Sequence, residues 1–264
     1  MLTAMETVEM ARFARGVGDV AGCVSLSDSA VRQATQEHHP DAAYMAAEVP
    51  GRMFMGRGEP REAIAHYRYA LDLARLHNLK NRLGGAVHDL ALAVRETGDG
   101  AQFRRLAAEA FEHYSHSNPR DPCLTGLLAD VAQDAFDRHP NDREKASAAL
   151  QAWRGIPVCM KTVRYHMAAA AQQMVASATL GIRSRYDSAA EALDAYRLDM
   201  PDHEAVAMTF AYAARGALAM MDFEGAAYLC EIAIREGDAR EESVPAEEAR
   251  GVLADALAER NIFA

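Results

Sequence analysis

Residues 51–74 read GRMFMGRGEPREAIAHYRYALDLA, which describes the end of one helix, a tight turn and a second helix. Gly58-Glu59 is a turn pair, and Pro60 suits a first helical turn because its missing N–H would be unpaired there anyway. Beyond it, small and apolar residues recur at three- and four-residue spacing, which predicts a helix over 61–76 with one buried stripe. That stripe comprises Ala63, Ile64, Tyr67, Ala70, Leu71 and Ala74.

The same arrangement returns every forty residues. Turn pairs and small residues keep this spacing in three registers: Gly18-Asp19, Gly58-Glu59 and Gly98-Asp99; Ala11, Gly51 and Ala91; Ala30, Ala70 and Ala110. The stretch 86–98 also has the helical period, and we expect small residues where two helices of a pair approach closely. A fixed period of this length predicts a stack of helix pairs.

Composition favours the same fold class and excludes several functions. Fifty-five of the 264 residues are alanine, which argues against an all-β protein or a strand-rich α/β enzyme, and the net charge of −10 disfavours direct nucleic-acid binding. We expect no membrane span, because the most apolar stretch, 205–221, contains Arg215, and no secretory signal. Widely spaced cysteines favour a cytoplasmic location over a disulfide scaffold: Cys23, Cys123, Cys159 and Cys230.

The 51–74 stretch resembles the tetratricopeptide repeat family. The residues that match its small, aromatic and turn positions are Gly51, Phe54, Gly58, Ala63, Tyr67 and Ala70, and a weaker match over 205–236 rests on Ala214, Asp222, Ala226, Cys230 and Ala233. The resemblance implies an all-α, right-handed superhelix of about five to six antiparallel helix pairs with a C-terminal capping helix. Two features depart from the family pattern: the tryptophan near the start of each unit is absent, and the period exceeds the usual ~34 residues.

On this basis we expect a single repeat domain over 1–264. Its units are 4–38, 41–78, 81–116, 122–154, 158–198 and 202–237, and its capping helix is 244–261. Because the repeats begin almost at Met1, we expect no separate effector domain before them. An irregular helical bundle is the alternative.

Motifs for catalysis or metal binding are weak. The glycine-rich stretch 15–22 follows no predicted strand and coincides with the repeat turn, so we interpret it as structural. The ten histidines show no metal-ligand spacing, and no nucleophile elbow occurs. We therefore expect no catalytic residue, no metal and no cofactor. An all-helical enzyme remains an alternative, with candidate residues His88, Arg95, Arg164, Tyr165 and His166.

The family resemblance implies a concave groove lined by the first helix of each pair. The core stripe of these helices is expected to contain Met10, Ala11, Ala14, Gly51, Phe54, Leu90, Ala91 and Val94. The neighbouring stripe would face the groove and gives the candidate ligand-binding residues Met5, Arg12, Arg15, Met45, Arg52, Met55, His88, Arg95, Met208 and Arg215. Arginine binds carboxylates with two parallel hydrogen bonds, and methionine adapts to varied apolar groups.

The sequence therefore favours a non-enzymatic scaffold or adaptor whose Arg- and Met-lined groove binds a peptide or protein segment with carboxylates and apolar side chains. One alternative is that these arginines pair internally with acids such as Glu48, Asp89 or Glu96. Another is a bacterial regulatory sensor that binds a small peptide or an anionic ligand in the same groove. The Lys/Asn clamp of chaperone-tail receptors and the groove asparagines of quorum-peptide receptors are missing. An apolar stripe over 252–258 would seal the last repeat or support self-assembly into a homo-oligomer.

Overall fold

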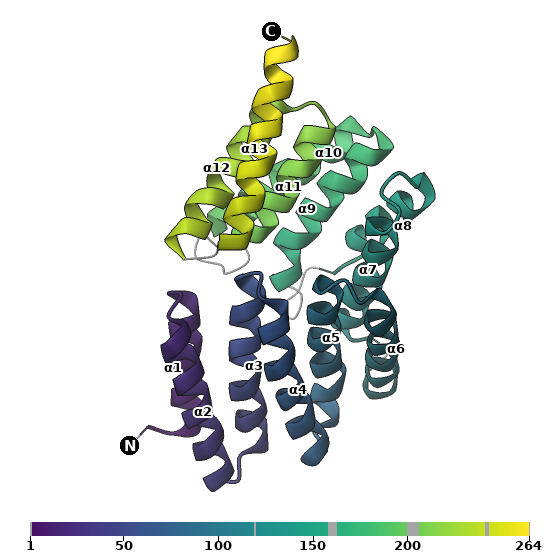
Figure 1. Ribbon diagram of the computed structural model, residues 1–264. Coiled ribbons are helices and arrows are strands. Elements are labelled where there is room, and N and C mark those ends of the chain that lie inside the picture. Colours follow the sequence, from purple (N-terminus) through teal and green to yellow (C-terminus); the bar gives the residue numbers. More distant parts are fainter. Residues whose placement is uncertain (1, 119, 158–162, 200–205, 241–242, 264) are drawn as a thin grey trace. The chain divides into compact units, whose positions relative to one another are not determined.

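The computed structural model describes residues 2–118, 120–157, 163–199, 206–240 and 243–263, and within them it contains thirteen α-helices and no strand (Figure 1). The helices are α1 (Ala4–Gly16), α2 (Val20–Gln36), α3 (Pro40–Gly56), α4 (Pro60–Leu76), α5 (Lys80–Glu96), α6 (Gly100–Ser117), α7 (Pro122–Asp137), α8 (Arg143–Arg154), α9 (Val163–Leu180), α10 (Arg183–Asp199), α11 (Val206–Ala219), α12 (Phe223–Ala239) and α13 (Ser243–Phe263). The predicted all-α fold of helix pairs with a final single helix is confirmed.

The chain divides into two compact units, Met1–Leu127 and Leu128–Ala264. In the N-terminal unit the pairs α1/α2, α3/α4 and α5/α6 follow one another, and α2 also contacts α3 as α4 contacts α5. In the C-terminal unit α9 contacts α8, α10 and α11, while α12 and α13 both pack against α11. The expectation of one continuous repeat domain over 1–264 stays a prediction.

Turns between paired helices use the glycines that the forty-residue register marks. Gly18, Gly58 and Gly98 have φ values of +78°, +71° and +86°, a left-handed conformation that glycine adopts without steric cost. Asp19 and Asp99 follow two of them and accept a hydrogen bond from the backbone N–H three residues later, which caps the second helix. Local sequence thus fixes the turn and the start of the next helix together.

Small residues on the first helices make room for aromatic rings from the second helices. A Cβ atom at Gly51 would lie 2.7 Å from the ring of Tyr67, and one at Gly84 would lie 2.8 Å from the ring of Tyr114. In the preceding repeat, Ala11 takes the place of Gly51 and the buried Ser27 takes the place of Tyr67. The larger residue on the first helix thus accompanies the smaller residue on the second. The close approach inferred from the sequence is therefore between backbone and ring in these two pairs.

One sequence expectation is wrong in detail. Met10 is 43% exposed and is not part of the core, because within the described residues α1 packs mainly against α2 and α3, and the side that carries Met10 and Phe13 stays exposed. The first helix of the third pair begins at Lys80, one residue before the expected start of that unit at 81, and its two glycines are accommodated inside the helix. Met10 apart, the expected core stripe of the first helices is buried or partly buried.

Candidate functional site

Three successive first helices bring side chains together in the N-terminal unit. Arg12 on α1 and Arg82 on α5 each place a guanidinium nitrogen near the sulfur of Met45 on α3, at 3.8 and 3.9 Å. Arg12 also pairs with Glu9 at 2.7 Å, and Arg82 pairs with Asp41 at 2.9 Å. We call Glu9, Arg12, Asp41, Met45 and Arg82 the first-helix surface. Its two arginine side chains are 35% and 36% exposed, so both are accessible to a partner.

A largely buried polar cluster lies between α3 and α5, and its members are Tyr44, Glu48, Arg52 and Asp89. The Arg52 guanidinium lies 3.2 Å from the carboxylate of Glu48 and 3.5 Å from that of Asp89. Both carboxylate residues are less than 10% exposed, and His88 is fully buried. Burial, together with the nearby carboxylates of Glu48 and Asp89, holds the pKa of Tyr44 well above its usual value. The Arg52–Asp89 ion pair joins two neighbouring repeats.

Two further predicted groove arginines, Arg95 and Arg215, also have acidic and aromatic neighbours. Arg95 pairs with Glu96 at 3.0 Å and lies over the ring of Phe103. Arg215 pairs with Glu248 of α13 at 2.6 Å. Arg15 is partly buried. Arg52, Arg95 and Arg215 therefore make the internal ion pairs of the alternative interpretation, and their binding role stays a prediction.

The predicted methionines differ in exposure. Met5 is 40% exposed at the start of α1, whereas Met45, Met55 and Met208 are partly buried. Met208 and Arg215 belong to the C-terminal unit, and the other candidates belong to the N-terminal unit. The structure thus brings Arg12 and Met45 together and adds Arg82. Sequence reasoning missed Arg82 because the candidates that it chose on this helix were only His88 and Arg95; extending the same stripe toward the N-terminus of the helix reaches Arg82.

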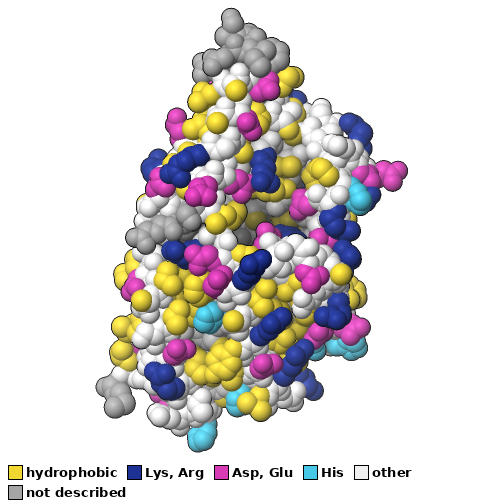
Figure 2. Space-filling view, in the orientation of Figure 1, with side chains coloured by type: hydrophobic (Ala, Val, Ile, Leu, Met, Phe, Trp, Pro, Cys, Tyr) yellow, Lys and Arg dark blue, Asp and Glu magenta, His cyan; other side chains and the backbone are white. Residues whose placement is uncertain are grey.

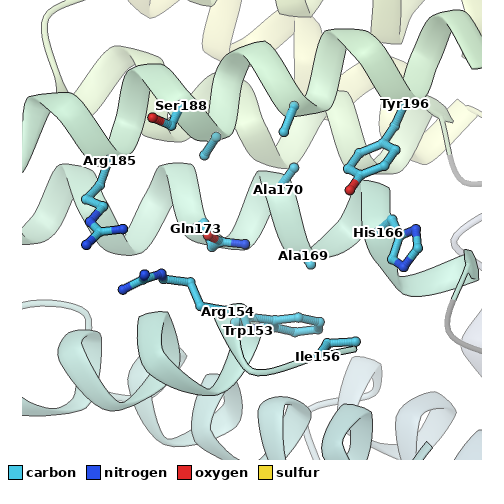
Figure 3. Close-up of a pocket in the computed structure, with 12 residues that line it drawn as sticks. Trp153, Arg154, Ile156, His166, Ala169, Ala170, Gln173, Arg185, Ser188 and Tyr196 are labelled. Carbon is cyan, nitrogen blue, oxygen red and sulfur yellow. The ribbon is translucent and has the colours of Figure 1, made fainter. Parts of the chain in front are cut away.

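Residues proposed for an all-helical enzyme do not gather in one described site. His88 is fully buried on α5 with its ring edge against Tyr114, and Arg95 lies on the same helix. The side chains of Arg164 and Tyr165 fall outside the described residues. His166 lines a cavity of about 300 Å³ bounded by α8, α9 and α10 (Figure 3). Among the described residues, no group of three or more His, Cys, Asp or Glu side chains could hold a metal ion.

Surface charge is mixed on the face of the molecule shown in Figure 2, where basic and acidic side chains alternate over both units. This distribution matches the many ion pairs between neighbouring side chains and shows no broad basic field on that face. None of the helices, over the residues described, is long and apolar enough to cross a membrane.

Comparison with known proteins identifies the fold. No protein-family model and no curated protein sequence matches the chain. Among solved structures, the Rap protein in complex with Competence and Sporulation Factor is similar, with a TM-score of 0.63 and 13% identity over 93% of this chain. The match spans 65% of the length of that chain.

Two other solved structures are weaker matches. The TPR-like repeats of a kinesin light chain from Podosopora anserina have a TM-score of 0.48 and 16% identity, over 75% of this chain and 96% of that one. The TPR2AB domain of yeast Sti1 in complex with pHSP90 has a TM-score of 0.36 and 11% identity, over 96% and 98%. With its repeated helix pairs and its likeness to Rap, the chain is an all-helical repeat protein with the tetratricopeptide-repeat type of fold.

Proposed function

We propose that this protein is a non-enzymatic scaffold whose N-terminal unit binds an extended peptide or protein segment along α1, α3 and α5. The observation that carries the proposal is the first-helix surface, where Arg12, Met45 and Arg82 come from three successive first helices. Such a surface suits a segment that crosses several repeats and offers carboxylate and apolar groups in turn. Met5 and Met55 would extend the apolar part of this contact.

Energetics support exchange of the existing ion pairs for a partner's carboxylates. The Arg12–Glu9 and Arg82–Asp41 pairs are well exposed, and ion pairs of this kind contribute only about 0–1 kcal/mol to stability. A partner carboxylate that replaces Glu9 or Asp41 would therefore displace a weak contact. Arg52 has a different role in this proposal, because its two buried carboxylates require its charge.

Further support comes from the fold. Rap, which shares the fold, was solved with Competence and Sporulation Factor bound, so a repeat stack of this type accommodates a second molecule. We place the protein in the cytoplasm, where the buried thiol of Cys230 would remain reduced. Met208 and Arg215 are proposed as contacts of the C-terminal unit with the same partner or with a second copy of the chain.

Selection from a library of short random peptides displayed on phage tests the proposal. We expect enriched peptides to contain both acidic and apolar residues. Binding of one such synthetic peptide should weaken about tenfold in Arg12→Ala and in Arg82→Ala, because each loses a charge-assisted contact. Arg75→Ala is the matched control, since Arg75 is an exposed, ion-paired arginine on the second helix α4 of the same unit. Failure to enrich any peptide, or equal loss in the control, would refute the proposal.

A further inference from the structure

The cavity in the C-terminal unit lies on the side of the second helices. Its walls come from the end of α8, one face of α9 and one face of α10. With 12 residues α8 is short, whereas α2, α4, α6, α10 and α12 have 17 or 18. The shortfall of about five residues corresponds to roughly 7.5 Å of helix at 1.5 Å per residue. Part of α9 therefore lacks the cover that a full-length second helix would give.

One end of the cavity is positively charged. Figure 3 shows Arg154 of α8 and Arg185 of α10 extending toward the same end, with Gln173 of α9 beside them. Neither arginine has an ion-pair partner in the described part of the chain, and no lining residue is acidic. This is unusual in a protein of net charge −10 whose other arginines so often pair with acids. Two guanidinium groups that share one opening favour a bound anion.

The other end is aromatic and contains a buried polar atom with no partner. Trp153, His166 and Tyr196 lie toward this end in Figure 3, and the imidazole is 5.3 Å from the tyrosine ring. His166 is 8% exposed, and its Nε2 makes no hydrogen bond to any described residue. Burial lowers the pKa of His166, so the ring is neutral near pH 7. An unsatisfied buried nitrogen costs about 1–3 kcal/mol, which a ligand group inside the cavity would offset.

We propose that this cavity is a binding site for a small organic anion, with a carboxylate or phosphate group held by Arg154 and Arg185 and an apolar or aromatic body against Trp153 and Tyr196. The volume of about 300 Å³ is at the lower end for small-molecule sites, which limits the ligand to the size of one amino acid derivative or one aryl phosphate. His166 would contribute a hydrogen bond to a polar group of that body. This site does not depend on partner binding by the N-terminal unit.

The chain contains its own reporter, because Trp153 is its single tryptophan and it lines the cavity. Four probes separate the contributions: N-acetylphenylalanine, its neutral amide, acetate and phenyl phosphate. We expect N-acetylphenylalanine or phenyl phosphate to change the tryptophan emission saturably, and the stronger of the two identifies the anionic group. The amide and acetate should bind at least about tenfold more weakly, since each lacks one of the two complementary parts.

Variants connect the signal to the two arginines. Arg154→Gln and Arg185→Gln should each weaken the better probe about tenfold, as expected for the loss of one charge-assisted contact. The matched control is Arg183→Gln, since Arg183 lies two residues away on the same helix but pairs with Asp187 at 2.8 Å and does not line the cavity. Far-ultraviolet circular dichroism confirms that each variant is folded. Equal binding of acid and amide, no saturable response to any anion, or equal loss in the control would overturn the proposal.

Discussion

Alanine substitutions at the adjacent glycines Gly84 and Gly85 of α5 should have opposite effects on stability. Each change should strengthen the helix by up to about 1 kcal/mol, because alanine loses less backbone entropy than glycine on folding. At Gly84 the new methyl group would lie 2.8 and 2.9 Å from two ring carbons of Tyr114, whereas at Gly85 its nearest contact is the Tyr114 hydroxyl at 3.9 Å. Only the first substitution therefore causes a steric conflict.

The size of that conflict follows from how the ring is held. Tyr114 is 6% exposed and its ring meets the edge of His88, so it has little room to move away. Overfilling a well-packed core costs about 1–3 kcal/mol. When the gain in helix propensity is subtracted from this cost, Gly84→Ala should lower the free energy of unfolding by about 0–2 kcal/mol. Gly85→Ala should raise it by about 0.5–1 kcal/mol.

Thermal unfolding followed by circular dichroism measures the difference. Both variants change the same helix, so the cooperativity of the repeat stack affects them equally. The Tm of Gly85→Ala should rise and that of Gly84→Ala should fall or stay level. Equal shifts of the same sign in the two variants would show that the steric reasoning is wrong.

A double-mutant cycle with Tyr114→Ala identifies the cause. In that background the ring is gone, so Gly84→Ala should become stabilising, with an interaction energy of about 1–3 kcal/mol. If the stability effects of the two substitutions are additive, Tyr114 is not the residue that requires a glycine at 84.

Three further predictions concern charge and burial. Arg52→Ala should lower the free energy of unfolding in urea by about 2–4 kcal/mol, because it leaves two buried carboxylates without a compensating charge. Arg12→Ala removes one side of an exposed ion pair and should change this free energy by less than about 1 kcal/mol. Burial lowers the pKa of His66, so the unfolded chain binds the proton more readily than the folded chain. The free energy of unfolding should therefore fall as the pH drops below about 6.5. Urea unfolding at several pH values measures this loss, and it should be smaller in His66→Phe. Burial raises the pKa of Cys230 to about 11, and its side chain is fully buried. This thiol should therefore react with a disulfide reagent at pH 8 only as fast as the protein opens. Rapid labelling of Cys230, located by mass spectrometry, would contradict this prediction.

Much of the fold was predictable because helices and turns depend on near neighbours in the chain. The period of forty residues gave the turns at Gly18, Gly58 and Gly98, and all three have positive φ. The predicted helix over 61–76 corresponds to α4, which begins one residue earlier at Pro60. A helix-wide stripe and a turn residue are visible in a window of about 15 residues, which is why both could be read without coordinates.

The candidate sites were predictable only in part. A pair such as Arg52 and Glu48 follows from their four-residue spacing on one helix, but the second contact of Arg52, with Asp89, joins residues on different repeats. The ion pair of Arg82 with Asp41 also joins residues on different repeats, and the sequence alone does not predict it. Opposite charges attract strongly only over a few ångströms, and the chain order does not reveal which of many acids lies that close.

By itself, the sequence determined that this chain forms antiparallel helix pairs in a repeating stack, because periodic burial and glycine turns are local properties. Only the tertiary structure decided which arginines are neutralised by nearby acids and which are not. Arg154 and Arg185 look like any other arginines in the sequence, and they share an opening because a short α8 and a full-length α10 both lie against α9. That difference arises from distances between helices, which no local pattern of residues encodes.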